Sequence, residues 1–236
     1  MFVDLHHHLI YGVDDGARTR EEMQKMILRA ADEGISDIVC TSHATPGIHP
    51  FPTEAYLAHF REAVQWCADN QLPIVLHTGC EVLYTPMSAR LIREGYYPTL
   101  AETNCVLVEF SGDVTFKQLC EAARTLGNEG FTVLFAHVER FDVLRKLERV
   151  KQLRDEYGVF MQMNANTILS KKGFFTERWV RKMMELGYID CVATDAHNTT
   201  SRPCQMKQCY QRLEEMYGVD TAEELCGGFQ RRFLSL

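Results

Sequence analysis

Short apolar runs alternate with longer amphipathic stretches along almost the whole chain. The expected strands are rich in β-branched or apolar residues and cover residues 2–5, 37–41, 74–78, 106–110, 132–136, 159–163 and 189–194. The expected helices lie between and after them, over residues 20–33, 53–70, 116–129, 142–157, 176–186, 203–217 and 221–234. Strands that alternate with helices in this way predict parallel strands joined by crossover helices, and therefore an α/β fold.

The strand runs also indicate how the sheet is covered. IVLHTG, VLVEFS and VLFAHV are apolar at successive positions, which is typical of strands buried on both faces. Seven such units can form either an open doubly wound sheet or a closed barrel. Because no linker, repeat or low-complexity segment interrupts them, we expect residues 1–236 to form a single domain.

Composition and charge exclude several classes of protein. A formal net charge of -7 argues against a general nucleic-acid or anionic-membrane binder, because both need a basic surface. The nine cysteines are odd in number and include no CxxC pair, which favours reduced thiols over a disulfide framework. The N-terminal stretch lacks the features of a signal peptide, and no apolar run approaches membrane-spanning length. We therefore expect a cytoplasmic protein that does not insert into membranes.

Residue types that bind metal ions occur at the ends of six of the seven expected strands. They are His6 and His8, His43, Glu81, Glu109, His137, and Asp195 with His197. Asp14 and Asp15 follow the first strand, and Asn164 ends the remaining one. The carboxyl ends of barrel strands converge on one face, whereas an open sheet would spread these residues along an edge. The pattern therefore favours a barrel.

The spacing and chemistry of these residues indicate several ions. Residues two apart on a strand point the same way, so His6 and His8 can share an ion while His7 faces away. Imidazole and carboxylate ligands suit Mn, Fe, Zn or Mg. Roughly nine ligands exceed what one ion can use, so we expect two or three ions. Clustered ions of this kind suit the hydrolysis of a phosphate ester.

The segments DLHHHLIYGVDDG, CTSHAT, GCEVLYTP, LVEFS, FAHVER and TDAHN occur in this order and carry a family resemblance. The chain resembles the polymerase and histidinol phosphatase (PHP) superfamily. More closely, these segments are similar to the manganese-dependent protein-tyrosine phosphatases encoded with bacterial capsule and exopolysaccharide genes. The resemblance runs from about Phe2 to the end of the chain and implies a distorted TIM-like (β/α)7 barrel with three ions.

The resemblance also implies a role for individual residues. One ion is expected at His6, His8, Glu81 and Asp195, a second at Glu81, Glu109 and His137, and a third at Asp15, His43 and His197. Asp14 is the less favoured member of its acidic pair. Arg140 and Arg202 match positions that clamp the phosphate, and a guanidinium suits bidentate contacts to phosphate oxygens. We expect catalysis to depend on these arginines together with Asp195 and His137.

The activity implied is hydrolysis of phosphotyrosine on a protein by direct attack of a metal-bridging hydroxide, without a covalent phosphoenzyme. The implied partner is a bacterial tyrosine autokinase, whose tyrosine-rich tail would be the substrate, and manganese the implied metal. One departure from the family concerns ATPGIHPFPTEAY after His43, where close relatives often carry basic residues. This difference weakens the expectation of a preference for multiply phosphorylated peptides.

Several alternatives remain open at this point. A histidinol-phosphate or other small-molecule phosphatase would show the same metal ligands. A thiol-based phosphatase would need C-x5-R, which Cys226 to Arg232 matches, but within a terminal helical segment with no strand before it. An amidohydrolase would need a lysine on the fourth strand and a histidine on the sixth, where Glu109 and Asn164 stand. The acidic balance disfavours a nuclease, and the complete ligand set disfavours a non-enzymatic barrel. The exposed helix faces are compatible with a homo-oligomer.

Overall fold

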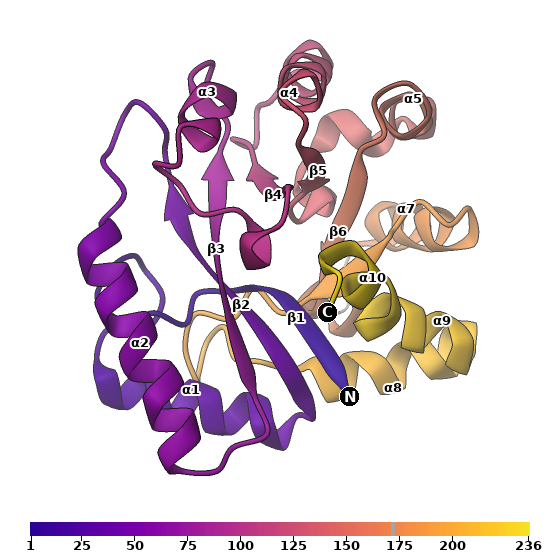
Figure 1. Cartoon of the computed structure of the whole chain (residues 1–236). Coiled ribbons are helices and arrows are strands. Elements are labelled where there is room, and N and C mark those ends of the chain that lie inside the picture. The colour runs from indigo at the N-terminus through magenta and orange to yellow at the C-terminus, as the bar shows by residue number, and fades with distance from the viewer. Residues whose placement is uncertain (171–172) are drawn as a thin grey trace.

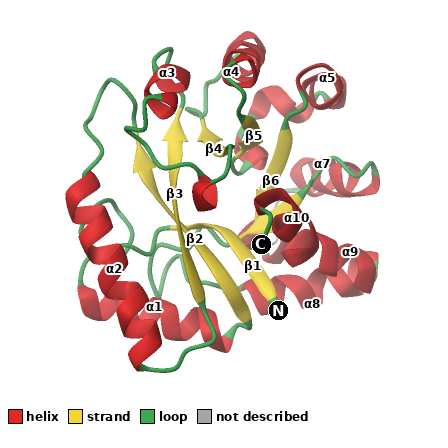
Figure 2. Ribbon diagram, in the orientation of Figure 1, coloured by secondary structure: helices red, strands yellow, loops and turns green. Residues whose placement is uncertain are grey.

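The computed structural model describes residues 1–170 and 173–236. Within these residues, seven parallel strands form one sheet in the order β1 to β7, and helices surround it (Figures 1 and 2). The strands are β1 (Phe2–His7), β2 (Ile35–Ala44), β3 (Val75–Leu83), β4 (Cys105–Glu109), β5 (Thr132–Phe135), β6 (Phe160–Asn164) and β7 (Cys191–Ala193). The expected α/β class and parallel arrangement are confirmed.

The first strand meets the end of the last one, so the sheet nearly closes into a barrel. The amide of Asp195 donates to the carbonyl of His6 at 2.8 Å, and the amide of His8 donates to the carbonyl of Ala196 at 2.9 Å. The pairing between β5 and β6 is short, with Leu134 opposite Phe160 and Phe135 opposite Met161. The barrel is therefore distorted, as expected, and its strands all finish at the same end.

Helices cover the outside of the barrel (Figure 1). They are α1 (Arg20–Asp32), α2 (Thr53–Asp69), α3 (Ser88–Arg93), α4 (Phe116–Asn128), α5 (Leu147–Tyr157), α6 (Ala165–Leu169), α7 (Phe174–Glu185), α8 (Met206–Tyr217), α9 (Val219–Glu223) and α10 (Phe229–Leu234). Two of them begin with side-chain caps, because Thr19 accepts from the amide of Glu22 and Thr115 forms a capping box with Gln118.

The limits of several strands differ from those expected. β2 runs to Ala44 and β3 runs to Leu83, beyond the expected ends at residues 41 and 78. The extra residues include His43 and Glu81. Both are polar, so a prediction based on apolar runs ends each strand before it reaches them. β7 is shorter than the expected segment 189–194. Two candidate ligands therefore lie inside strands, where their direction is fixed by the sheet.

Some helices differ as well. The expected helix 142–157 begins with a 3₁₀ turn, Asp142–Arg145, and becomes α-helical only from Leu147, because the backbone of Lys146 is extended. The expected helix 221–234 is divided by a π-helical turn at Glu224–Gly228. Neither α3 nor α6 was expected, since a helix of five or six residues is too short to show a helical period.

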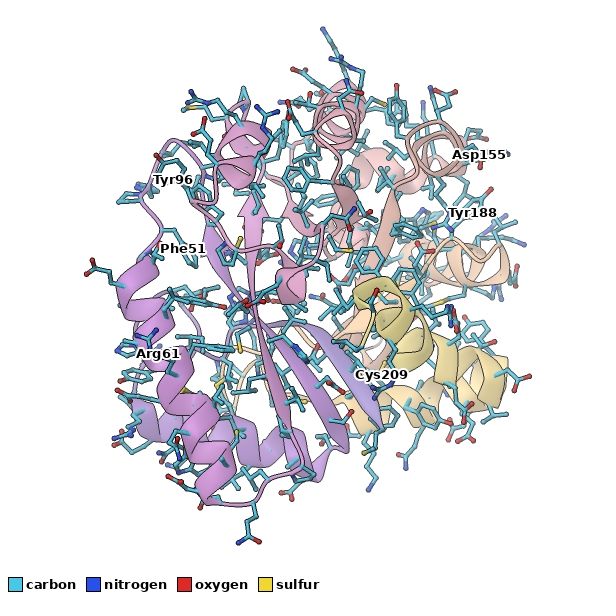
Figure 3. The ribbon with its side chains drawn as sticks, viewed as in Figure 1. Phe51, Arg61, Tyr96, Asp155, Tyr188 and Cys209 are labelled. Atoms are coloured by element: carbon cyan, nitrogen blue, oxygen red, sulfur yellow. The ribbon has the colours of Figure 1, made fainter. Side chains whose placement is uncertain are left out.

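Two apolar cores hold the barrel and its helices together. A large core fills the space between the strands and the surrounding helices. A smaller one lies within the barrel and joins Val3, Leu5 and Leu107 to Phe229 and Leu234 of α10. The C-terminal helix therefore closes the barrel at the end where the strands begin (Figure 1), and the opposite end stays available for the site. Polar side chains such as Arg61 and Asp155 lie on the outer helix faces (Figure 3).

The cysteines and helices also bear on the expectations from composition. All nine cysteines are free, and all except the half-buried Cys120 are buried. None of the described helices combines the length and apolarity needed to cross a bilayer.

Candidate metal centre

The residues expected to bind metal ions meet at the end of the barrel where the strands finish. His43 and Glu81 are register partners on β2 and β3, and side chains at such positions project on the same side of a sheet. The other expected ligands come from four further strand ends: His6 and His8 from β1, Glu109 from β4, His137 after β5, and Asp195 and His197 after β7. Asp15 joins them from the loop that follows β1.

The first group contains the four residues expected to share one ion. His6 Nε2 lies 3.1 Å from Glu81 Oε2 and 3.4 Å from Asp195 Oδ1. His8 Nε2 lies 3.3 Å and 3.5 Å from the same two oxygens. The two Nε2 atoms are 3.2 Å apart. Four potential ligand atoms therefore converge on one point, and all four side chains are almost fully buried.

The second group is built around both oxygens of Glu81. His137 Nε2 lies 2.8 Å from Glu81 Oε1 and 3.7 Å from Glu109 Oε2. His43 Nδ1 lies 3.2 Å from Glu81 Oε2 and 3.1 Å from Glu109 Oε1. The structure thus brings together the expected trio of Glu81, Glu109 and His137, and adds one nitrogen of His43 to it.

The third group forms around Asp15. Its Oδ1 atom lies 3.3 Å from His43 Nε2 and 3.3 Å from His197 Nε2. His8 is also close enough for the potential ligand atoms of all four residues to lie within 4.8 Å of one another. His8 and His43 therefore stand between neighbouring groups, so the three groups form one continuous cluster.

Unusual backbone conformations aim two of these side chains. His137 and Asp195 have φ angles of 33° and 53°, in the left-handed region that few residues other than glycine adopt. Such strain persists only where the surrounding structure imposes it, and it is concentrated at functional sites.

Gly16 allows the loop after β1 to lie close to that strand, since a Cβ atom at this position would lie 2.2 Å from the carbonyl oxygen of His8. The Asp-Asp-Gly loop can approach β1 this closely because the glycine has no side chain.

Sequence reasoning missed Gln162, which connects several of the candidate ligands. It is fully buried on β6. Its Oε1 atom accepts from the amide of His137 at 2.8 Å and lies 3.2 Å from His6 Nδ1. Its Nε2 donates to Asn164, which in turn donates to Asp195 Oδ2 at 2.7 Å. The available signal was a pair of polar residues two apart in an otherwise apolar strand, which places both on the barrel side.

Asp14 has a supporting position beside the cluster. Its carboxylate accepts from His8 Nδ1 at 2.9 Å, from the amide of Gly16 at 2.9 Å and from the amide of His43 at 3.0 Å. These contacts hold the His8 ring in place, whereas Asp15 faces the other histidines. The structure therefore places Asp15 in the cluster and Asp14 behind it.

The cluster shifts the pKa values of its members. Burial alone would lower the pKa of His8, but hydrogen bonds with Asp14 and Glu81, and their charges, outweigh it and raise that pKa to about 10. Burial would raise the pKa of Glu81, but His6 and His137 hold it well below its ordinary value. Burial and the charge of His8 lower the pKa of His197 to about 3. When no cation is bound, protons on some of the imidazoles therefore balance the carboxylates.

The donor set fits divalent cations. Each of three imidazoles has an oxygen next to its Nδ1 atom: Gln162 beside His6, Asp14 beside His8, and the Asp195 carbonyl 2.9 Å from His197. Donation of the Nδ1 hydrogen to such an oxygen leaves the Nε2 lone pair directed into the cluster, which is the usual arrangement of metal-binding histidines. His197 Nε2 is buried and has no hydrogen-bond partner among the described residues.

Two arginines border the cluster on its solvent side. Arg140 Nη2 lies 2.7 Å and Arg202 Nη2 2.9 Å from Asp195 Oδ2. Their side chains are 48% and 39% exposed, so each guanidinium can still reach a group that enters from solvent. Asp195 thus contacts the histidines through one oxygen and the arginines through the other.

The C-x5-R segment lies elsewhere. Cys226 is fully buried on the π-helical turn, in the large core between the strands and the surrounding helices. A phosphate group cannot reach its sulfur there. The geometry gives no support to a thiol nucleophile at this position.

Comparison with known proteins gives a consistent result. The family model for capsular polysaccharide synthesis proteins CpsB/CapC matches residues 2–234. The tyrosine-protein phosphatase CpsB of Streptococcus pneumoniae is 33% identical over 233 residues, which cover 94% of each chain.

Solved structures resemble the fold. One comes from a study of YwqE from Bacillus subtilis and CpsB from Streptococcus pneumoniae, described as metal-dependent tyrosine phosphatases. It has a TM-score of 0.81 at 22% identity and covers 93% of this chain and 89% of its own. The histidinol phosphate phosphatase of Lactococcus lactis has a TM-score of 0.60 at 13% identity, with 97% of each chain covered.

Proposed function

Because this chain belongs to the CpsB/CapC family of capsular polysaccharide synthesis proteins, we propose that it is a metal-dependent protein-tyrosine phosphatase. The reaction is the hydrolysis of a phosphoric monoester, with phosphotyrosine on a protein as the substrate. The relative from Streptococcus pneumoniae bears the name of this activity and aligns along nearly the whole chain.

One observation in the structure supports this function above the others. Nine side chains with metal-binding groups gather at one end of the barrel, and two half-exposed arginines stand at their edge. The nine are His6, His8, Asp15, His43, Glu81, Glu109, His137, Asp195 and His197. We assign these residues as the metal ligands, with Arg140 and Arg202 as the groups that hold the phosphate.

The cofactor is a divalent metal. The imidazole and carboxylate groups of the cluster are compatible with Mn, Fe, Zn or Mg. We assign manganese as the metal and expect two or three ions per chain. When bound, such ions supply a hydroxide at neutral pH and neutralise charge on the transferring phosphoryl group.

The chain's own residues position the substrate. Arg140 and Arg202 present planar donors that match the non-bridging oxygens of a phosphate. Asp195 fixes both guanidinium groups through its outer oxygen, so their orientation is set before the substrate arrives. His137, held by its strained backbone and by Gln162, keeps its ring against Glu81. These contacts orient the phosphate and reduce the reorganisation needed during the reaction.

The physiological partner in this proposal is a bacterial tyrosine kinase whose tyrosine-rich tail carries the phosphate, and the enzyme acts in the cytoplasm. Support comes from the family, whose name links it to capsular polysaccharide synthesis. Removal of phosphate from the kinase would then control capsule and exopolysaccharide synthesis.

The test compares substrates on the purified chain loaded with manganese. We expect a phosphotyrosyl peptide to be hydrolysed far more efficiently than histidinol phosphate or single-stranded DNA, and chelation to abolish the activity. Cys226→Ser is the matched control, because a buried thiol outside the cluster should leave turnover unchanged. Efficient hydrolysis of histidinol phosphate alone would refute the tyrosine-phosphatase assignment, and activity that survives chelation would refute the metal requirement.

Metal affinity is expected to depend on pH. The pKa of His8 is raised to about 10 by Asp14 and Glu81 against the effect of burial, so this imidazole is protonated at pH 7 when no cation is bound. A metal ion needs the neutral ring, and its binding must therefore release protons. Affinity should rise with pH from 6 to 9, with the release of about one proton or more per chain at pH 7. Calorimetry in two buffers of different ionisation enthalpy measures this release, and equal heats in both would contradict the prediction.

A further inference from the structure

A small hollow of about 330 Å³ borders the metal cluster on the side of β6. Its lining consists of Glu139, Arg140, Arg145, Asn164, Asn166, Thr167 and Thr176. Two of these residues, Arg140 and Asn164, also donate to Asp195. The hollow therefore lies directly beside the place where a phosphate would be held. It can receive a substrate side chain that neighbours the phosphotyrosine.

Arg145 is a cation of this hollow whose guanidinium is only partly used by contacts within the described residues. Its guanidinium lies over the ring of Trp179, 4.7 Å from the ring centre, and Nη2 donates to the carbonyl of Glu139 at 3.0 Å. The Trp179 ring is itself fixed, because Nε1 donates to the carbonyl of Leu144 at 2.9 Å. Arg145 Nη1 is buried and has no hydrogen-bond partner among the described residues. A buried donor without a partner is unfavourable, so an incoming acceptor would relieve it.

The acidic groups near Arg145 do not form a hydrogen bond with its Nη1 atom among the described residues. Asp142 Oδ1 lies 3.7 Å from Arg145 Nε, but the Asp142 side chain is 94% exposed and contacts the edge of the guanidinium away from Nη1. The Glu139 carboxyl group is buried, and its Oε1 accepts from the amide of Asn164 at 3.2 Å and from the hydroxyl of Thr167 at 2.9 Å. The other oxygen, Oε2, is buried without a hydrogen-bond partner among the described residues, so Glu139 is only partly satisfied and forms no ion pair with Arg145 there.

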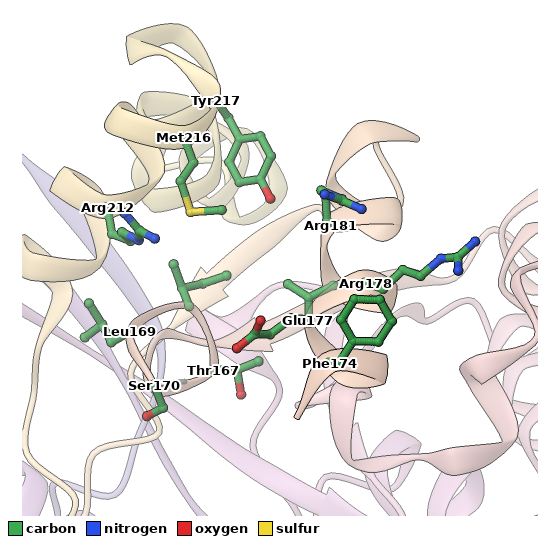
Figure 4. A pocket seen from close by; sticks show the side chains of 12 residues that line it. Thr167, Leu169, Ser170, Phe174, Glu177, Arg178, Arg181, Arg212, Met216 and Tyr217 are labelled. Atoms are coloured by element: carbon green, nitrogen blue, oxygen red, sulfur yellow. The ribbon is translucent and has the colours of Figure 1, made fainter. Parts of the chain in front are cut away.

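A larger hollow beyond Thr167 has a different character (Figure 4). It has a volume of about 580 Å³, lies between α6, α7 and α8, and contains Glu177. Two of its three lining arginines are partly satisfied, because Arg181 lies 3.8 Å from Glu185 and Arg212 lies 3.3 Å from Glu215. Its lining does not include the residues that contact Asp195. The small hollow is the better candidate for contact with the substrate.

We propose that Arg145 and this hollow form a specificity subsite for an anionic side chain next to the phosphotyrosine. The oxygens of a carboxylate or of a second phosphate would accept from the Arg145 guanidinium, whose side chain is 32% exposed, with the amides of Asn164 and Asn166 and the hydroxyl of Thr176 beside them. This inference rests on the proposed function, and it concerns which phosphoprotein sequences the site accepts. It also adds a positive group near a site whose loop after His43 lacks the expected basic residues.

The test uses phosphotyrosyl peptides that differ at one flanking position. Glutamate is compared with glutamine at each position from three before to three after the phosphotyrosine, and phosphoserine is compared with serine in a second arm. We expect at least one position at which glutamate raises kcat/KM about fivefold, as for a partly exposed ion pair. Arg145→Gln should abolish this preference and leave kcat/KM for free phosphotyrosine within about twofold. A larger gain in the phosphoserine arm would identify phosphate as the preferred anion.

Arg149 provides a matched control. Its guanidinium also lies over an aromatic ring, that of Phe116 at 5.3 Å, and Nη1 donates to the carbonyl of Val143 at 3.1 Å, but it does not line this hollow. Arg149→Gln should keep the full preference for glutamate.

The proposal fails if neither anion is preferred at any position, or if the preference survives in Arg145→Gln. It also fails if this substitution slows free phosphotyrosine as much as the peptides, since that would indicate a structural role only. If the chain without any substitution did not hydrolyse free phosphotyrosine, the proposed function itself would be overturned.

Discussion

Glu81→Gln is expected to lower the turnover of a phosphotyrosyl peptide by about 10³-fold and to reduce the metal content of the purified chain. Glu81 Oε2 lies 3.1 to 3.3 Å from nitrogens of His6, His8 and His43, and Oε1 lies 2.8 Å from His137 Nε2. An amide at this position removes one negative charge and directs two N–H hydrogens at the nitrogens that should bind cations. The measurements are elemental analysis and steady-state kinetics on the same sample.

Glu33→Gln is the control for the general effect of neutralising a buried carboxylate. Glu33 is 7% exposed, and its oxygens contact Arg29 Nη2 at 2.8 Å and the amide of Lys207 at 2.9 Å, outside the metal cluster. This variant should lose some stability while it retains its metal content and its kcat. If Glu81→Gln keeps a full complement of metal and full activity, the central position of Glu81 is wrong.

The sequence allowed the architecture to be predicted because each level of the pattern agreed. Apolar runs marked all seven strands, and candidate ligands at their ends favoured a barrel over an open sheet. Boundaries were less predictable where function required polar residues within strands. His43 and Glu81 lie inside β2 and β3, although both are positions where an apolar pattern stops. A polar residue that faces the functional end of the barrel interrupts the apolar pattern of the sequence, although the strand itself continues through it.

The candidate ligands could be named from the sequence, but the contacts that hold them could not. The polar pair Gln162 and Asn164 and the acidic pair Asp14 and Asp15 are visible in the sequence, but the supporting roles of Gln162 and Asp14 follow from contacts such as the 3.2 Å between Gln162 Oε1 and His6 Nδ1. The same holds for the sharing of His43 between two groups of ligands, since one ring presents Nδ1 to Glu109 and Nε2 to Asp15. Such relations depend on three-dimensional placement, which residue types alone do not define.

Asp195 connects the two chemical tasks of the site. Its Oδ1 faces His6 and His8. Its Oδ2 accepts from Arg140 and Asn164 and forms an ion pair with Arg202 at 2.9 Å. The pKa of Asp195 lies well below its ordinary value, because the charges of His6, His8 and Arg202 outweigh the opposing effects of burial and of the Glu81 charge. The carboxylate therefore stays ionised at neutral pH and keeps the arginines next to the metal ligands. Substitutions at the arginines should consequently separate substrate binding from metal binding.

Arg140→Gln and Arg202→Gln are each expected to lower kcat/KM for a phosphotyrosyl peptide by about 10²-fold, with metal content unchanged. Among the described residues, the Arg140 guanidinium pairs with the outer oxygen of Asp195, and the Arg202 guanidinium pairs with the same oxygen and lies 3.8 Å from Asp15 Oδ2. Neither contacts Glu81 or a histidine ring in these pairs, so the loss of either should leave those ligands in place. The effects of the two substitutions should not be additive, because both arginines share one acceptor oxygen and would hold the same phosphate. Arg140→Lys should recover part of the loss, since it restores the charge without the two parallel donors.

The control for these substitutions is Arg154→Gln. Arg154 also pairs with a carboxylate that is largely shielded from solvent, through Nη2 at 3.0 Å from Asp190 Oδ1, but the pair lies outside the metal cluster. Its loss should lower the melting temperature while kcat/KM remains within about twofold of the original value. A fall in metal content in the Arg140 or Arg202 variants would show that these residues support the ions and not the phosphate. An unchanged kcat/KM in both variants would remove them from the site altogether, because a phosphate held only by metal ions would not sense the loss of either guanidinium.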